Sequence, residues 1–427
     1  MSDYIKATDF ALKDTLPSGD SGKIVKGTEI DDEFNAIEAT VVTKADRDGT
    51  NLLDGAVATA KIADNAITTA KLATGIAPVV SSINGGQLAG MRNKIINGKM
   101  EIAQRGTSFA AAGSGVYTLD RWVPSSSTAG VVTISQQADV PADNEFQSSL
   151  RVAVTTADAS IAASDNFGVF QNIEGFNVRD LIGRTFTLSF WVRSSKTGTH
   201  CVSLRNGAGD RTYVAEYTVS AANTWEKKSI TVSSGLITAG TWNWTNGLGL
   251  SVGFNLYCGS TFQTTAGSWQ TGNFLATANQ VNCLDTIGNI FAITGVQLEV
   301  GSVATPFEHR PYGAELALCQ RYYYRNTAGV AGAPLLGVGA FATINSANLQ
   351  FNYPVPLRSA PSVIDYGNVY IGDGTVGAAV TSLGASFYGP NGSQVNMVSS
   401  ASFTAGRGAY VYAGVSAAAY VAFSAEF

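Results

Sequence analysis

The stretch GVQLEVGSVATPFEHRPYGAELALCQRYYYR, residues 295–325, decides how the rest of the chain divides. Its first residues, 296–300, alternate apolar and polar side chains, which is the period of a half-buried strand. Pro306 and Pro311 follow, and because proline cannot donate to a sheet ladder, regular strand pairing ends there. The run GAELALCQRYYY (313–324) then predicts a short helix. One domain therefore ends near Pro311, and the next begins soon after the helix.

The composition favours strands and turns over long helices. Charged residues make up 14% of the chain, well below the ~25% of an ordinary soluble protein, and small and hydroxyl residues replace them. The net charge of −5 comes without a basic cluster, so we expect no nucleic-acid partner. No stretch approaches the ~20 apolar residues that span a bilayer, so we expect no membrane insertion. The opening MSDYIKATDF lacks the regions of a signal peptide, so we expect assembly in a cytoplasm.

The cysteine spacing argues against a metal site. Four cysteines stand far apart in the sequence: Cys201, Cys258, Cys283 and Cys319. None has the spacing of a zinc site. His200 beside Cys201 suggests a ligand pair or a nucleophile and its base, but adjacent strand residues point to opposite faces. We therefore expect buried structural thiols, and no cofactor.

The N-terminal region contains a predicted helix at residues 28–46. Thr28 can cap it, acidic residues fill its first turn and Lys44 lies near its end, as the helix dipole favours. Its apolar residues form a narrow seam of the kind that a coiled coil buries: Ile30, Phe34, Ile37 and Val41. Two interpretations stay open, a helix lying on another subunit and a trimeric coiled coil.

A ten-residue repeat follows, DGAVATAKIA from residue 54 and DNAITTAKLA from residue 64. Large apolar residues recur in it every five positions: Leu52, Val57, Ile62, Ile67 and Leu72. We interpret each unit as a brief strand and a helical turn that winds with identical chains, because two units are too few for a stacked solenoid. The alternative is an Ala-rich helix or a flexible linker. Residues 75–90 have the composition of a hinge.

The central region predicts an antiparallel sandwich. The run KIINGKMEIAQRG (94–106) reads as strand, kink at Asn97-Gly98, strand. Turn-rich connections separate the strands that follow, which suits a two-sheet sandwich. These predicted strands are residues 130–137, 149–156, 167–173, 186–195, 201–206, 211–219, 226–233, 248–257 and 290–300.

The last hundred residues carry almost no charge. Between residue 326 and the end, the charged residues are Arg358, Asp365, Asp373, Arg407 and Glu426. Alternating runs between Gly/Pro turns predict another small β-sandwich. A surface with so little charge is seldom exposed to solvent, and we therefore expect contacts between subunits. Five tyrosines are candidates for either the subunit interface or a host contact: Tyr366, Tyr370, Tyr388, Tyr410 and Tyr412.

Five motifs in order resemble a jelly-roll domain of bacteriophage tail-fibre and related virion proteins. They are MRNKIINGKMEIAQRGTSF (91–109), YTLDRW (117–122), SFWVRSS (189–195), NTWE (223–226) and the opening stretch at 295–325. The resemblance covers just over half of the chain. The segment at 7–38 is similar to the N-terminal portions that attach tail fibres of short-tailed phages to the virion. The AITTAKLA repeat resembles the shaft segments of trimeric phage fibres.

This resemblance implies a mainly β homotrimeric fibre in four parts. Residues 1–50 form an arm with a helix that attaches to a phage tail or adaptor protein, and residues 51–90 form a repeat shaft and hinge. Residues 91–312 form the jelly roll, which is also similar to carbohydrate-binding modules, and residues 313–427 form a linking helix and a β-sandwich tip. The expected location is the virion, and the expected partner is a host surface polysaccharide. Some relatives hold a structural calcium near the opening strand, but Glu101 is the only obvious carboxylate there, and we expect no metal.

The six tryptophans divide into two groups. Trp122, Trp191 and Trp225 sit inside the motifs, where core packing is expected. Three others lie in Gly/Thr-rich connections, where an indole face is free to stack on a sugar: Trp242, Trp244 and Trp269. Trp244 falls outside the motifs and is the first candidate for a glycan contact. Tyr388 and Tyr410 are further candidates.

Catalysis is not expected. The pairs Asp165/Glu174 and Asp210/Glu216 have the residue types of a glycosidase, but no aromatic residues bracket either pair. Two alternatives to a receptor-binding tail fibre stay open. One is a tailspike that depolymerises polysaccharide, and the other is a head- or tube-bound decoration fibre without a receptor role.

Overall fold

The structure is a computed structural model, which describes residues 5–41, 90–142 and 145–427. The chain divides near residue 80 into two compact units, and each is described by itself. The predicted repeat shaft lies outside the described residues, and so do four of the predicted trimerisation residues: Val57, Ile62, Ile67 and Leu72.

Within its described residues, 5–41, the N-terminal unit contains three helical elements, α1 (Phe10–Asp14), η1 (Ser21–Lys23) and α2 (Gly27–Val41). The predicted cap at Thr28 is wrong, because α2 begins one residue earlier, at Gly27. Glu29 instead accepts a hydrogen bond from the backbone N–H of Lys26 at 3.0 Å, as the third residue of a capping box does. Glu29 also pairs with Lys13 at 2.7 Å, which ties the start of α2 to α1.

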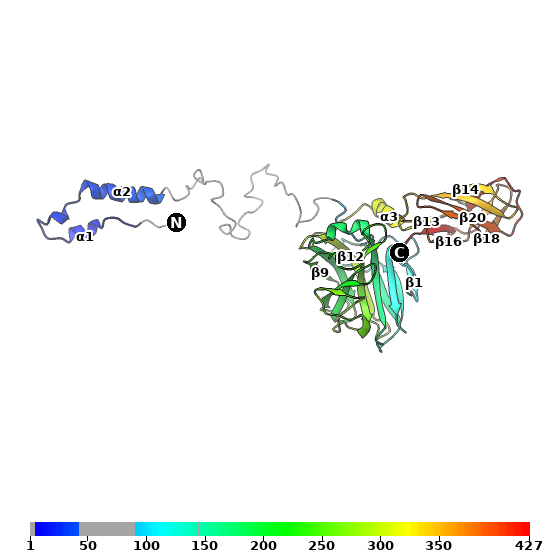
Figure 1. The fold of residues 1–427 in the computed structure, drawn as a ribbon, viewed down its shortest axis with the longest axis horizontal. Coiled ribbons are helices and arrows are strands. Elements are labelled where there is room, and N and C mark those ends of the chain that lie inside the picture. The colour runs from blue at the N-terminus through cyan, green and yellow to red at the C-terminus, as the bar shows by residue number, and fades with distance from the viewer. Residues whose placement is uncertain (1–4, 42–89, 143–144) are drawn as a thin grey trace. The chain divides into compact units, whose positions relative to one another are not determined.

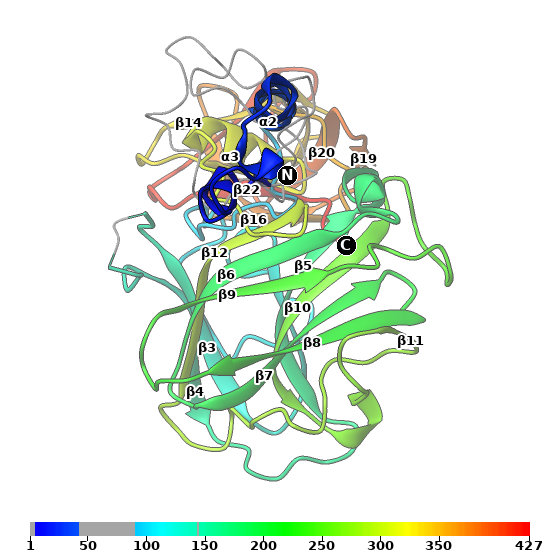
Figure 2. The same cartoon turned by 90° about the vertical axis from the view of Figure 1, so that its left-hand side faces the viewer.

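The central domain is a jelly roll of two antiparallel sheets (Figures 1 and 2). One sheet has the order β1-β3-β4-β12-β6-β9 and the other has the order β11-β8-β7-β10-β5-β2. The strands are β1 (Ser108–Ala110), β2 (Trp122–Ser127), β3 (Val131–Gln137), β4 (Ser149–Thr156), β5 (Asn166–Glu174), β6 (Phe186–Ser194), β7 (Gly198–Asn206), β8 (Arg211–Val219), β9 (Glu226–Val232), β10 (Leu248–Cys258), β11 (Trp269–Thr271) and β12 (Ile290–Val300). Short helices η4 (Gly175–Asn177), η5 (Arg179–Leu181) and η6 (Ser260–Phe262) lie in the connections.

The core of the jelly roll lies between the two sheets. Trp122, Phe190 and Phe254 are fully buried at its centre, and the ring of Phe254 lies 4.9 Å from that of Phe190 and 6.1 Å from that of Trp122. Along each strand, side chains that point into this core alternate with side chains that point to the other face of the sheet, as the sequence pattern indicated. The prediction of a mainly β, antiparallel fold is confirmed.

The opening run at 94–106 does not form the predicted strand–kink–strand. Asn97 and Met100 have φ angles of 57° and 60°, which interrupt an extended strand. The run lies beside β12 instead, where Lys94 N donates to Leu298 O at 2.8 Å and Val296 N donates to the carbonyl of Gly98 at 3.0 Å. A Cβ at Gly98 would overlap the carbonyl oxygen of Val296, so the close approach requires glycine there.

The two longest motifs meet through a buried polar network. Glu308 accepts from the backbone N–H groups of Arg92 and Asn93, each at 3.0 Å. Arg310 donates to the carbonyl of Asn93 and pairs with Glu308 at 3.2 Å and with Glu315 at 3.3 Å. Because buried polar groups must find partners, these residues fix the chain path at the start and the end of the jelly roll.

The linking helix is shorter than predicted. It is α3 (Tyr312–Gln320), and β13 (Tyr323–Thr327) begins three residues later. Tyr323 and Tyr324 were expected in the helix, but they pair with Ser424 and Phe423 in the last strand of the chain. This distant partner overrides the local helical pattern.

The tip contains a three-stranded sheet, β13-β22-β16, and a seven-stranded sheet, β15-β14-β21-β17-β18-β20-β19. β15 also pairs with β20, so six strands of the larger sheet close on themselves. The strands are β14 (Pro334–Phe341), β15 (Ser346–Asn352), β16 (Val363–Gly367), β17 (Tyr370–Gly372), β18 (Gly377–Leu383), β19 (Phe387–Tyr388), β20 (Gly392–Ser399), β21 (Gly408–Tyr412) and β22 (Tyr420–Ser424).

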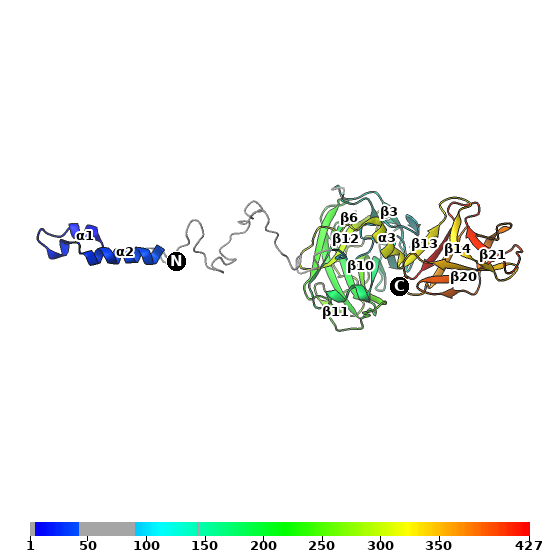
Figure 3. The same cartoon turned by 90° about the horizontal axis from the view of Figure 1, so that it is seen from above.

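The tip is joined to the jelly roll by α3 and by the last residues of the chain (Figures 1 and 3). Arg121 of the jelly roll pairs with Glu426, and both side chains are almost fully buried. The guanidinium of Arg121 also lies 3.4 Å from the ring centroid of Tyr322. The same guanidinium lies 5.7 Å from the ring centroid of Phe427 of the tip. Cation–π contacts and a buried ion pair therefore hold this junction.

Candidate functional site

Trp242, Trp244 and Trp269 meet on one surface of the jelly roll, and we call them the tryptophan cluster. Trp242 and Trp244 lie two residues apart in the connection from β9 to β10, and their rings stack with centroids 5.1 Å apart and planes 10° apart. Trp269, the first residue of β11, meets Trp242 edge-on at 5.7 Å. All three side chains are half-buried. The three tryptophans predicted as glycan contacts are thus neighbours in space.

Hydrogen bonds fix the positions of two of these rings. Trp242 Nε1 donates to the carbonyl of Ala239 at 2.9 Å, and Trp269 Nε1 donates to the carbonyl of Gly235 at 2.9 Å. The Asn243 side chain accepts from the backbone N–H groups two and four residues further on, at 2.9 and 3.2 Å, which holds the loop in a tight turn. The indole N–H groups of Trp242 and Trp269 are satisfied within the protein, so at these two residues contact with a ligand is left to the ring faces and exposed edges.

A cavity of about 320 Å³ adjoins Trp242 of the stacked pair, and it is lined by Gly207, Ala208, Thr241, Trp242, Asn243 and Leu248. This volume is at the lower end of small-molecule sites. Asp210 lies beside it and accepts from Asn206 Nδ2 and from the backbone N–H of Thr241. These hydrogen bonds, first that from Asn206, lower the pKa of Asp210. Aromatic faces beside a carboxylate can stack on the C–H groups of a sugar ring and accept from its hydroxyls.

The two tyrosine candidates lie elsewhere, on the tip. Tyr388 is on β19 and is 44% exposed, and Tyr410 is on β21 and is 37% exposed. Three other strands separate β19 from β21 in the sheet. Tyr410 instead neighbours Tyr412, with ring centroids 5.5 Å apart. The structure therefore does not bring the two tyrosines into one site with each other.

The motif tryptophans differ in burial. Trp122 is fully buried, and its Nε1 donates to the carbonyl of Asn97 at 3.2 Å. The core position expected for Trp191 and Trp225 is wrong, because both are half-buried outside the core. Phe190 fills the core position of β6, so the next residue, Trp191, points to the outer face of the sheet.

The predicted helical seam is exposed on α2. Ile30 is 41% exposed, Phe34 is 65% exposed and Ile37 is 38% exposed. Val41 is the last residue of α2. Exposed apolar side chains at this spacing suit a partner helix, and the trimer stays a prediction.

All four cysteines are free and buried, as predicted. His200 Nδ1 lies 3.8 Å from Cys283 Sγ rather than beside Cys201. Burial lowers the pKa of His200, and burial raises the pKa of Cys283 to about 12. At neutral pH this pair is therefore uncharged, and it does not supply a reactive thiolate.

The two candidate carboxylate pairs are far apart. Asp165 and Glu174 stand at opposite ends of β5, nine residues apart, which is roughly 30 Å at strand spacing. Asp210 and Glu216 are six residues apart along β8 and the turn before it, or roughly 20 Å. A glycosidase pair needs about 5–10 Å, so neither pair has that geometry.

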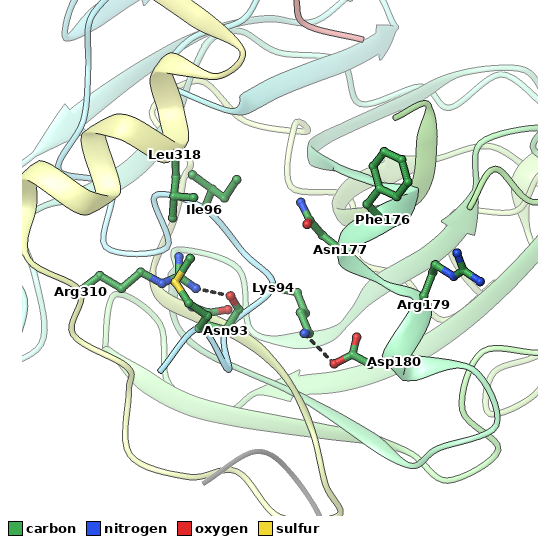
Figure 4. Close-up of a pocket in the computed structure, with 10 residues that line it drawn as sticks. Asn93, Lys94, Ile96, Phe176, Asn177, Arg179, Asp180, Arg310 and Leu318 are labelled. Atoms are coloured by element: carbon green, nitrogen blue, oxygen red, sulfur yellow. Dashed lines mark hydrogen bonds and ion pairs between the residues drawn. The ribbon is translucent and has the colours of Figure 1, made fainter. Parts of the chain in front are cut away.

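A second cavity, of about 380 Å³, lies beside the opening motif (Figure 4). Lys94 points toward Asp180, with 2.7 Å between Nζ and Oδ2. Arg310 reaches the carbonyl of Asn93 on the opposite side. Sequence reasoning missed the pairing of Lys94 with Asp180, because 86 residues separate the two side chains and no local pattern links them.

In residues 5–41, 90–142 and 145–427, no helix has both the length and the apolar character needed to cross a bilayer. Over the same ranges, no group of three or more His, Cys, Asp or Glu side chains is placed to hold a metal ion.

Comparison with known proteins gives no family. No family model matches the chain, and no curated protein matches it. Similar solved structures include the enzymatically active domain of tailspike protein 4 of bacteriophage CBA120, at 17% identity and a TM-score of 0.29 over 49% of this chain. The match covers 21% of that tailspike chain.

Carbohydrate-binding modules are also among the similar structures. The family 11 module of a cellulosomal cellulase of Clostridium thermocellum is 12% identical, with a TM-score of 0.27 over 46% of this chain and 96% of its own. The module TmCBM61, solved with beta-1,4-galactotriose, is 12% identical, with a TM-score of 0.25 over 49% of this chain and 99% of its own. In each case the similarity covers about half of this chain.

Proposed function

We propose that this protein is a bacteriophage tail fibre that recognises a host surface polysaccharide with its C-terminal domains. Residues 1–50 attach it to the phage tail or to an adaptor protein, and three identical chains form the fibre. The observation that supports the glycan-binding role is the tryptophan cluster, where Trp242 stacks on Trp244 and lines a cavity beside the carboxylate of Asp210.

Recognition without catalysis is enough for this role. The wide separation of both candidate carboxylate pairs along their strands supports a binding function. Several weak glycan contacts on one particle raise its effective affinity by about 10²–10⁴ through avidity.

The test is binding of the full chain to a panel of immobilised bacterial surface polysaccharides. Trp244→Ala should weaken binding about tenfold, because a lost aromatic stacking contact is worth about 1 kcal/mol and is multiplied by avidity. Trp225→Ala is the matched control, since it removes another half-buried tryptophan outside the cluster. If the Trp244→Ala variant bound the polysaccharide as tightly as the wild type, the tryptophan cluster would not be the glycan-binding site. If the full chain instead generated new reducing ends in the polysaccharide, the result would support the alternative function, a tailspike that depolymerises polysaccharide.

A further inference from the structure

A cavity of about 360 Å³ lies where the jelly roll meets the tip, and we call it the junction cavity. The jelly roll contributes Arg105, Phe109 and Tyr117 to its wall. The tip contributes alternate residues of the three-stranded sheet β13-β22-β16, whose side chains share one face. Those that the argument uses are Tyr323, Arg325, Asp365 and Tyr420.

Two guanidinium groups in this cavity are held by tyrosine rings. Arg105 Cζ lies 3.5 Å from the ring centroid of Tyr323 and 5.3 Å from that of Tyr117. Arg325 Cζ lies 3.7 Å from the ring centroid of Tyr420. Stacking on aromatic faces leaves the N–H edges of a guanidinium free to donate, and its planar fork matches a carboxylate.

The wall also contains unmet polar atoms. In the described structure, Arg105 Nη1 and Tyr117 Oη are buried without a hydrogen-bond partner. Of the Arg105 guanidinium, Glu426 contacts Nη2, at 3.4 Å, and not Nη1. The same carboxylate also pairs with Arg121. Since buried donors normally find acceptors, an acceptor from a ligand would complete this wall.

The remaining groups restrict what the ligand is. Asp365 is an exposed acceptor, and it takes a hydrogen bond from Tyr420 Oη at 2.8 Å. A carboxylate at this position repels a doubly charged phosphate more strongly than a singly charged carboxylate, and it accepts from hydroxyl groups. The rings of Phe109 and Tyr117 supply apolar faces of the kind that stack on a pyranose.

We propose that the junction cavity binds a carboxylate-bearing saccharide unit. Arg105 and Arg325 receive its carboxylate, Tyr117 and Phe109 receive its ring, and Asp365 accepts from a hydroxyl. The choice of a sugar rests on the glycan recognition proposed above, but the site is separate from the tryptophan cluster. It lies partly on the tip, so the ligand contacts both domains at once.

The test is calorimetric titration of the full chain with glucuronic acid, N-acetylneuraminic acid, glucose and acetate. At least one acidic sugar should bind at least tenfold more tightly than glucose and than acetate. Arg325→Ala should weaken that binding at least tenfold. Arg407→Ala removes the same charge from a 49% exposed side chain paired with Asp373 elsewhere on the tip, and it should leave binding unchanged.

Three results would overturn the inference. They are glucose binding as tightly as the acidic sugars, acetate binding as tightly as the acidic sugars, and wild-type affinity for the acidic sugar in Arg325→Ala. A readout on the unaltered protein guards against a variant that fails to fold. The acidic sugar should slow modification of Arg325 by phenylglyoxal, and a lack of protection would also count against the site. Trp244→Ala should leave acidic-sugar binding intact. If only Trp244→Ala loses polysaccharide binding, the loss reports on the tryptophan cluster. If only Arg325→Ala loses binding, the loss reports on the junction cavity.

Discussion

Arg321 donates two hydrogen bonds to the carboxylate of Glu174, from Nε to Oε2 at 2.9 Å and from Nη2 to Oε1 at 2.7 Å. Tyr322 Oη donates to the same carboxylate at 2.9 Å. Glu174 ends β5 and its side chain is 1% exposed, whereas Arg321 follows α3 and is 34% exposed. One carboxylate of the jelly roll therefore anchors the start of the tip through three donors.

Glu174→Ala should destabilise this junction by about 2–3 kcal/mol, because it leaves a guanidinium and a buried hydroxyl without their acceptor. The measurement is urea unfolding of the full chain. Lys196→Ala is the control, since it breaks a pair with Asp285 in which both side chains are about 30% exposed, and it should cost less than about 1 kcal/mol. Equal losses in the two variants would contradict the anchoring role.

Gly98→Ala should destabilise the jelly roll by about 1–3 kcal/mol, because the new methyl group would overlap the carbonyl of Val296 and push the opening run away from β12. Gly313→Ala has open space around it within α3. It should stabilise the protein by about 0.5–1 kcal/mol, since alanine favours the helix. Thermal unfolding should thus shift in opposite directions for the two substitutions.

Acid should destabilise the jelly roll in part through His200. Burial lowers the pKa of His200 in the folded state, so the unfolded chain binds the proton more readily. Its contribution to stability is complete above the ordinary pKa of about 6.5 and is lost as the pH falls below it. Denaturant unfolding between about pH 7 and pH 5 should show this loss, and His200→Phe should reduce the slope. An unchanged slope would rule out this residue as the source.

The thiols should not react with a thiol reagent in the native protein. Burial raises the pKa of Cys258 and of Cys283 to about 12, so almost no thiolate forms at neutral pH. Reaction with Ellman's reagent should begin only after denaturant is added, when all four cysteines become available. Fast labelling of the folded chain would show that a cysteine is accessible.

The seam on α2 should govern assembly. Phe34→Asp places a charge on the most exposed apolar side chain of the seam, so it should shift the full chain from the trimer toward the 44.5 kDa monomer in sedimentation. Asn35→Asp adds the same charge to the neighbouring exposed position, and it should leave the trimer intact. A wild-type chain that sediments as a monomer would refute the three-chain fibre itself.

Much of the jelly roll follows from alternation in the sequence. The predicted strands at 211–219 and 290–300 match β8 and β12. In β8 the residues that pack in the core stand at alternate positions, from Tyr213 to Val219. The run at 94–106 misled because its path depends on positive φ angles at Asn97 and Met100 and on pairing with β12. The end of α3 depends likewise on β22, about a hundred residues away, and such contacts leave no local signal.

The candidate site could be predicted only in part. Trp242, Trp244 and Trp269 stood out because they lie in turn-rich connections, but the edge-on contact of Trp269 with Trp242 depends on how β11 pairs with β8. Arg105, Arg325 and Asp365 gave no signal, since more than 200 residues separate the first from the other two. Their shared cavity forms only when the tip docks on the jelly roll.

The closure of the tip's larger sheet through β15 and β20 bears on the aggregation of an almost uncharged domain. An open sheet edge presents unpaired N–H and C=O groups that recruit strands from other molecules. Six strands here have a neighbour on either side, so a foreign strand finds no template among them. These six strands therefore need no lysines to protect them from edge-to-edge aggregation, and the edge strands of the tip are β13, β16 and β19.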